Sequence, residues 1–176
     1  MESFKDKLES LFNQYGVLKT FSRGDYLTRE GETETSLYYI ESGAVRAFYL
    51  SEHEESVIRL GYKGSIITSL SSFLTGRPSD LYIEAIRKTS TRILSKSALR
   101  ELVNQDIDTL RQYTTLLEQT LIQQMDREID LITPSPAERL ERVLNRSPHL
   151  FQEIPLKYIA SYLRMTPETL SRIRNS

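Results

Sequence analysis

Residues 154–176 read IPLKYIASYLRMTPETLSRIRNS, which is two short helical patterns with a tight break between them. Ile159 and Leu163 place apolar side chains on one face of the first helix. Thr166 suits the N-cap of the second helix, and Pro167 suits its first position, where a backbone N–H would have no partner. This spacing predicts a helix-turn-helix, a motif that presents its second helix to the major groove of DNA.

The second helix of this pattern has two unlike faces. Leu170 and Ile173 form an apolar inner face, whereas the side chains left for the outer face are polar or basic. These outer residues are Glu168, Thr169, Ser171, Arg172 and Arg174. A lone arginine is usually no more than a solvated surface residue, so it is the whole pattern that predicts contact with DNA.

The composition is that of an ordinary globular protein. At 176 residues, with 39% apolar and 27% charged side chains, the chain suits one domain with a small appended one. It has no apolar run long enough to span a bilayer, and its charged start, MESFKDKLES, lacks the apolar core of a signal peptide. The absence of cysteine excludes disulfides and metal sites built on thiolates. We therefore expect a cytoplasmic protein with no membrane partner and no bound metal.

The net charge of −1 conceals an asymmetry along the chain. Residues 134–176 carry seven Lys/Arg and four Asp/Glu, a net charge of +3, whereas the remaining 133 residues carry −4. A basic end on an acidic body suits a small phosphate-binding module. Three charges alone do not distinguish such a module from chance, so the asymmetry only supports the motif.

Residues 20–95 read as a succession of short strands without helical crossovers. The clearest stretch is SLYYIESGAVRAFYL at 36–50, in which Ser42-Gly43 makes the turn between two β-rich runs. The patterns SVIRLGY, SIITSL, LYIEAI and TRILS follow, and the turns are marked by Gly24, Gly31, Gly43, Gly64 and Gly76. This arrangement predicts an antiparallel roll. A helix is predicted before it over residues 1–19, with one apolar stripe of Phe4, Leu8, Leu11 and Phe12.

A helical period begins at Ser97 and continues in a long helix from about Asp106 to Ile132. At 1.5 Å per residue this helix is about 40 Å long, and it is apolar on more than one side. We therefore expect it to pack against the roll and against the same helix of a second subunit, around a two-fold axis. The expected dimer contacts are Leu110, Tyr113, Leu117, Leu121 and Met125. The alternative is a helix buried within a single chain.

The segment TPSPAERL ends the long helix and begins another. Ser135 and Glu138 fit a capping box, with Pro136 at the first helical position. We expect the hinge of the molecule at 133–136. The predicted domains are a sensor roll over 1–105, the long helix over 106–133 and a DNA-binding unit over 134–176.

This order of elements resembles the Crp/Fnr family of bacterial transcription regulators over nearly the whole chain. The pieces that carry the resemblance are TPETLSRIR at 166–174, GETETSLYYIESGAVRAF at 31–48 and SFLTGRPS at 72–79. It implies an α+β fold, made of an antiparallel β-roll like the cyclic-nucleotide-binding jelly roll, a long dimerisation helix and an all-α helix-turn-helix. It also implies a non-enzymatic homodimer that binds DNA and, if it is an activator, RNA polymerase. The short ending, without a wing, is similar to that of small Bacteroidetes regulators.

The resemblance assigns Glu168 and Arg172 to base contacts on DNA. The chemistry fits, because arginine pairs with the acceptors of guanine and glutamate accepts from cytosine N4. The other implied contacts, to bases or phosphates, are Lys157, Arg164, Thr166, Pro167, Thr169, Ser171 and Arg174.

Two residues depart from the family pattern at this motif. Pro167 stands where cAMP-responsive members often carry an arginine, so one base contact is lost and the preferred DNA site should differ. Arg164 stands at the turn, where glycine is usual, and we expect a left-handed strain of about 1 kcal/mol there.

The segment at 72–79 lies where the family has its phosphate-binding cassette. Members that bind cAMP carry a Gly-Glu pair, whose carboxylate accepts from the ribose, and an Arg-Ser or Arg-Thr pair, whose cation binds the phosphate. The corresponding positions here are Thr68-Ser69 and Ser79-Asp80, which supply neither group. We therefore expect that the roll does not bind cAMP or cGMP in the usual way.

The sequence accordingly does not decide what occupies the effector pocket. Arg77 lies two residues before the expected cation and would reach inward only in a reshaped loop. Side chains such as Phe73 and Tyr82 would fill the pocket, or another small molecule would occupy it, or it is vestigial.

Histidine content limits the other readings of a β-roll. His53 is the only histidine expected in the roll, on an exposed hairpin, which supports neither haem binding nor a metal enzyme of the cupin type. His149 is expected in a loop of the DNA-binding end. The remaining alternative is a dimeric signalling protein whose helix-turn-helix has decayed and does not bind DNA.

Overall fold

In the computed structural model, which describes residues 4–52 and 54–175, the chain forms two compact units divided between Leu116 and Leu117. The division falls within the long helix α4 (Ile107–Ile132), so α4 contributes residues to both units. None of the described helices is both long and apolar enough to cross a membrane.

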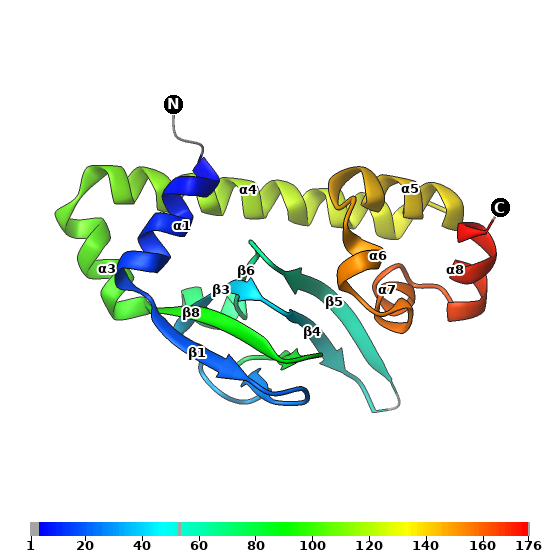
Figure 1. Cartoon of the computed structure of the whole chain (residues 1–176), viewed down its shortest axis with the longest axis horizontal. Helices are drawn as coiled ribbons and strands as arrows, with labels where there is room; N and C mark the ends of the chain where they lie inside the picture. Colours follow the sequence, from blue (N-terminus) through cyan, green and yellow to red (C-terminus); the bar gives the residue numbers. More distant parts are fainter. Residues whose placement is uncertain (1–3, 53, 176) are drawn as a thin grey trace. The chain divides into compact units, whose positions relative to one another are not determined.

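The first unit is a β-roll with helices at both ends of its sequence (Figure 1). Its strands form two four-stranded antiparallel sheets, in the orders β1-β8-β3-β6 and β2-β7-β4-β5. The predicted antiparallel roll of an α+β fold is thereby confirmed. The elements before α4 are α1 (Phe4–Tyr15), β1 (Val17–Phe21), β2 (Tyr26–Thr28), β3 (Ser36–Ser42), β4 (Ala44–Leu50), β5 (Glu55–Tyr62), β6 (Ile66–Ile67), α2 (Leu70–Thr75), β7 (Tyr82–Ala85), β8 (Thr89–Ser95) and α3 (Lys96–Gln105).

Both sheets contribute to one buried apolar core. Val45 and Ala47 of β4 point into it, because side chains two apart along a strand share a face. They meet residues of the other sheet, among them Tyr38 and Ile40 of β3. The remaining buried members of this core are Phe21, Ile67, Ile83 and Ala85.

Gly43 makes the predicted turn between β3 and β4. Its φ is +90°, in the region that only glycine adopts without strain, and a Cβ there would lie 2.4 Å from the carbonyl oxygen of Lys88. The other four glycines predicted at turns also have positive φ. The positions of these glycines in the sequence therefore predicted the turns between strands correctly.

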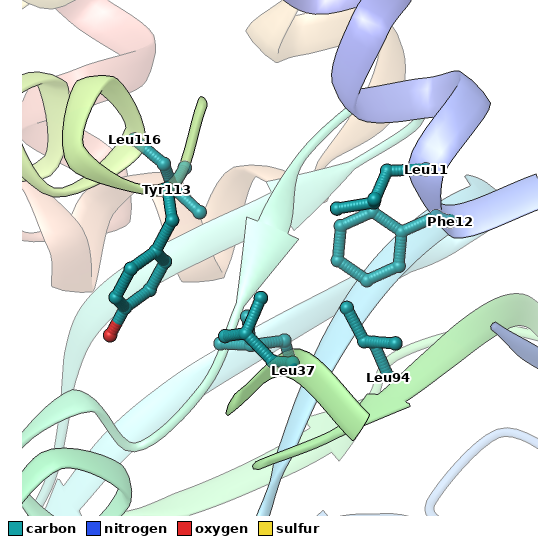
Figure 2. A pocket seen from close by; sticks show the side chains of 7 residues that line it. Leu11, Phe12, Leu37, Leu94, Tyr113 and Leu116 are labelled. Atoms are coloured by element: carbon teal, nitrogen blue, oxygen red, sulfur yellow. The ribbon is translucent and has the colours of Figure 1, made fainter. Parts of the chain in front are cut away.

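A second apolar cluster lies where α1, α3 and the start of α4 meet the roll. Phe12 of α1 stacks on Tyr39 of β3, with ring centroids 5.5 Å apart. In Figure 2, Leu11 and Phe12 lie opposite Tyr113 and Leu116 of α4, with side chains of β3 and β8 between them. The cavity lined there is about 10 Å³, the least that holds one water molecule, so the cluster is closely packed.

The N-terminal segment differs from its prediction. The helix ends at Tyr15 rather than near residue 19, because Gly16 closes it and Val17 begins strand β1, which pairs with β8. Strand β2 and the short helix α2 were not predicted either. Of the apolar stripe, Leu11 and Phe12 pack as expected, whereas the side chains of Phe4 and Leu8 lie outside the described residues, as does His53.

The second unit is all-helical and follows the end of α4. Its helices are α5 (Pro136–Arg146), α6 (Leu150–Glu153), α7 (Leu156–Tyr162) and α8 (Pro167–Arg174). The cap predicted at Ser135 is present, since its Oγ accepts a hydrogen bond from the backbone N–H of Glu138 at 3.3 Å. The segment between α5 and α7 contains the single turn α6 instead of an irregular loop, with His149 at its start.

Glu34, just before β3, is a buried carboxylate in the first unit, only 4% exposed. Its oxygens accept hydrogen bonds from the backbone N–H groups of Thr35 and Ser36, both at 2.9 Å, and from the hydroxyl groups of Thr28 and Tyr38. Burial raises the pKa of Glu34, and these hydrogen bonds lower it only in part. Folding therefore shifts the equilibrium of Glu34 toward its protonated form relative to the unfolded chain.

We expect Glu34→Gln to stabilise the chain at neutral pH more than in acid. The pKa of Glu34 is raised by folding, so its contribution to stability is complete below the ordinary glutamate pKa of about 4.3 and is lost as the pH rises through the folded-state value. The amide keeps the acceptor for Thr35 and Ser36 without a charge. Urea unfolding at about pH 4 and about pH 8 measures the free energy of unfolding of both proteins. The variant should exceed the wild type by more at about pH 8 than at about pH 4.

The matched control is Glu54→Gln, which removes an exposed carboxylate from the same roll. A difference in free energy of unfolding between Glu34→Gln and the wild type that is the same at both pH values, or that decreases with rising pH, would contradict a raised pKa of Glu34.

Candidate functional site

Helices α7 and α8 form a helix-turn-helix around a small apolar core. Ile159 and Ala160 of α7, Leu163 in the turn and Leu170 of α8 are each 1% exposed or less. Helix α5 contacts α8, and its Leu140 is buried as well. The sequence prediction of the inner faces of both helices thus agrees with the packing, and the outer face of α8 is left to solvent.

The turn between α7 and α8 is closed by two backbone hydrogen bonds. Met165 N–H donates to the carbonyl of Ala160 and Arg164 N–H to that of Ser161, both at 3.1 Å, which is the Schellman arrangement of a helix C-terminus. Arg164 occupies its left-handed position with φ of +54°, the only non-glycine residue with positive φ among those described. The left-handed conformation expected at this arginine is therefore present, and such a conformation typically costs a non-glycine residue about 1 kcal/mol.

The start of α8 is fixed by Thr166 and Pro167. The Thr166 Oγ1 accepts from the backbone N–H of Thr169 at 3.2 Å, and Pro167 occupies the first turn, as predicted. The Thr166 hydroxyl also donates to that of Thr169 at 3.1 Å. Both hydroxyl groups of these threonines are thus engaged in holding the helix, and their first role is structural.

The acidic and basic residues of α8 lie on its exposed side. Glu168 and Arg172, the predicted base readers, are both exposed, and residues four apart share one helix face. Arg174 is exposed too, with its guanidinium 4.9 Å from the ring centroid of Phe151 in α6. Ser171 is half-buried.

Lys157 lies apart from these residues, on α7. It is exposed, and its Nζ is 4.6 Å from the ring centroid of the neighbouring Tyr158. The second unit therefore offers two sets of cations, on α8 and at the start of α7.

The carboxylate of Asp130 joins the end of α4 to α5. Its side chain is fully buried and binds two arginines of α5, with Arg142 Nε 3.0 Å from Oδ1 and Arg146 paired to both oxygens. Removing one partner from a buried ion pair typically costs about 3–5 kcal/mol, because the other charge is left uncompensated. These bonds span the segment predicted as the hinge at 133–136, so α4 and α5 are tied together across it.

A second contact joins the end of α4 to α7. The guanidinium of Arg127 donates to the backbone carbonyl of Tyr162, the last residue of α7, and lies 3.8 Å from the centroid of its ring. Helix α4 is thereby attached next to the turn that precedes α8.

The predicted dimer residues of α4 fall into two groups. Leu121 and Met125 are 62% and 58% exposed, and Leu110 is exposed as well. Leu117 is half-buried. Tyr113 is different, because it packs against the apolar cluster of its own roll, where burial raises its pKa. Exposed Ile122, Ile129 and Ile132 extend the apolar surface of this helix.

Ser69 and Ser79, which the sequence predicts at the cassette positions of the ribose acceptor and the phosphate cation, are bonded to each other. Ser79 Oγ donates to Ser69 Oγ at 2.7 Å, and both side chains are 2% exposed. Ser79 Oγ also accepts from the backbone N–H of Leu81 at 3.0 Å. Thr68 is engaged elsewhere, since its hydroxyl donates to the carbonyl of Ser36. These hydroxyl groups are satisfied by the protein itself.

The other expected pocket residues are not brought together with this pair. Phe73 is buried in the cluster under α1 and α3. Tyr82 stacks on Phe48 at 5.2 Å, on the face of its sheet opposite the roll core. Arg77 and Asp80 are exposed. Phe73 and Tyr82 therefore lie apart from each other, because strand alternation turns Tyr82 away from the roll core and helix α2 turns Phe73 toward α3.

Sequence reasoning missed the contacts that join distant segments. The partners of Asp130 lie twelve and sixteen residues further along, and the serine pair of the cassette is ten residues apart. Asp130 is one of several carboxylates near the end of α4, and periodicity does not identify its partners.

Comparison with known proteins relates this geometry to a family. Residues 18–106, about half of the chain, match the model of the cyclic nucleotide-binding domain. FixK2 from Bradyrhizobium japonicum has a similar structure, with a TM-score of 0.78 and 22% identity over 91% of this chain and 83% of that one. No curated protein matches the chain.

Two further solved structures have the same fold. The c-di-GMP-responsive global regulator CLP from Xanthomonas campestris has a TM-score of 0.68 and 14% identity, over 96% of this chain and 88% of that one. The catabolite activator protein from Thermus thermophilus has a TM-score of 0.59 and 23% identity, over 96% and 81%. At these identities the likeness establishes the fold.

We expect Arg164→Gly to be more stable than Arg164→Ala by about 1 kcal/mol. Both variants lose the same charge and side chain, so their difference isolates the cost of a Cβ at φ of +54°. Thermal and urea unfolding of the two variants measure it. Equal stability, or a more stable alanine variant, would show that the turn does not hold this residue in the left-handed region.

Proposed function

Because the chain belongs to the cyclic nucleotide-binding domain family and has the fold of the Crp/Fnr regulators, we propose that it is a cytoplasmic, non-enzymatic transcriptional regulator that binds DNA as a homodimer. The observation that carries this proposal is the helix-turn-helix of the second unit, whose α8 presents a polar and basic side to solvent.

DNA recognition would be carried by Glu168 and Arg172. They are exposed on one side of α8, and this helix begins at a side-chain cap that holds it in one orientation. A recognition helix in the major groove uses such side chains to read base edges. Lys157, Arg164 and Arg174 would supply phosphate contacts, which set the position of the protein on the duplex.

Dimerisation would use the exposed side of α4. A soluble monomer seldom leaves side chains such as Leu121, Met125 and Ile132 open to water along one helix, and a second copy of α4 would cover them. A two-fold dimer also fits the target, because half-sites one helical turn of DNA apart, about 34 Å, are read by paired recognition helices.

The proposed sensor domain is the β-roll, which would not bind cAMP in the way that cAMP-responsive members of the family do. The positions for the ribose acceptor and the phosphate cation are Ser69 and Ser79, which bind each other and carry no charge. If the protein activates transcription, RNA polymerase would be a further partner. The response would pass through α4, whose end is bound to α5 and α7.

We expect Arg172→Ala to weaken binding to preferred DNA by about 1–3 kcal/mol and to relax selectivity at one base pair of each half-site. Preferred fragments are selected from genomic DNA with the wild-type chain, and fluorescence anisotropy then measures both proteins on them at several salt concentrations. Arg23→Ala, an exposed arginine of the roll, is the matched control. Weak binding by the wild-type chain, without preference among fragments, would instead favour a signalling protein whose helix-turn-helix no longer recognises DNA.

We expect Leu121→Glu to give monomers and to abolish specific DNA binding at the same time. Each chain of a dimer would bring one introduced carboxylate to the two-fold axis, and these two like charges would be buried against each other. Sedimentation measures the mass, and anisotropy measures the binding. Gln123→Glu adds the same charge at an exposed position on another side of α4 and should change neither. Specific binding by a monomeric Leu121→Glu variant would refute the dimeric scheme.

A further inference from the structure

A cavity of about 180 Å³ lies in the first unit among α2, α3 and the start of α4. Its apolar wall includes Phe73 of α2 with Leu99 and Val103 of α3. Its polar wall includes Lys96 and Arg100 of α3, and Tyr113 of α4 completes it. Neither Ser69 nor Ser79 lines it, so this cavity is separate from the cassette positions.

Both cations of the cavity wall come from one side of α3. Lys96 and Arg100 are four residues apart on α3, hence on the same side of that helix. The Lys96 ammonium donates to the backbone carbonyls of Phe73 and Leu74, at the end of α2, and an ammonium has a third N–H to offer. None of the residues that line the cavity is acidic.

Arg100 is the more available of the two cations. Its side chain is exposed to solvent, whereas Lys96 is half-buried and bonded to the end of α2. Tyr113 lies on the wall beside it: burial raises the pKa of Tyr113, and the positive charge of Arg100 offsets part of that rise. A planar guanidinium is well suited to bind a carboxylate through two parallel N–H groups.

The size of the cavity limits the occupant to a small molecule. An apolar cavity of about 150 Å³ is large enough to bind benzene, so about 180 Å³ holds one six-membered ring or an aliphatic chain of similar bulk.

We propose that this cavity is a binding site for a small monocarboxylate with an apolar body of about one ring, whose carboxylate binds Arg100 and Lys96 and whose body packs on Phe73, Leu99 and Val103. Such a ligand would touch the cassette helix α2 and the long helix α4 at once. If the proposed regulatory function holds, on which this last step rests, its binding would be transmitted directly to α4.

The test is a titration of the full chain, labelled with ¹⁵N, with benzoate up to about 10 mM, followed by amide chemical shifts. Saturable shifts confined to α2, α3 and the start of α4 are expected. Benzyl alcohol, which has the ring without the charge, should bind at least about tenfold more weakly, because it lacks the charge-assisted hydrogen bonds.

Two variants separate the site from a general effect of charge or folding. Arg100→Gln should weaken benzoate binding by about tenfold or more, whereas Arg23→Gln, which removes a surface arginine elsewhere on the roll, should leave it unchanged. Val103→Phe should fill the cavity and block benzoate without unfolding the chain, which its amide spectrum will show.

No saturable shift, shifts centred on Ser69 and Ser79, or equal binding by the Arg100→Gln variant would each overturn the site. The readout needs no DNA. Failure of the chain to bind DNA would therefore contradict the proposed function only. The benzoate titration would still test whether the cavity binds a carboxylate.

Discussion

The buried carboxylate of Asp130 is the interaction on which the arrangement of the second unit depends. It is fully buried, and Arg142 and Arg146 of α5 bind its two oxygens. Together with the contact of Arg127 to the end of α7, it makes the last turns of α4 part of the helix-turn-helix unit. The helix that exposes an apolar face and the helix that exposes Arg172 thus belong to one packed body.

The other end of α4 is bound in a different way. Tyr113 packs on the apolar cluster of the roll and lines the cavity beside Arg100, so that part of the helix depends on apolar burial. One continuous helix therefore packs within the first unit through an apolar contact and within the second unit through ion pairs. Ligand-dependent changes in the roll would act first on the apolar contact.

Local patterns in the sequence were sufficient for features that are themselves local. The turn at Gly43, the cap at Thr166 and the left-handed Arg164 each depend on a few neighbouring residues, and each was predicted. Strand β1 was missed because its pairing with β8, about seventy residues away, overrides the helical pattern of the segment before it. The bond between Ser69 and Ser79 and the partners of Asp130 arise from tertiary packing, which periodicity does not encode.

The proposed output of the molecule, a dimer that reads DNA, is tested most directly by the stoichiometry of the wild-type chain on a selected DNA fragment. Sedimentation of the complex should give two chains per duplex, and the logarithm of the affinity should fall linearly with the logarithm of the salt concentration, as phosphate contacts require. One chain per duplex, or weak binding without preference among fragments, would contradict the proposed function.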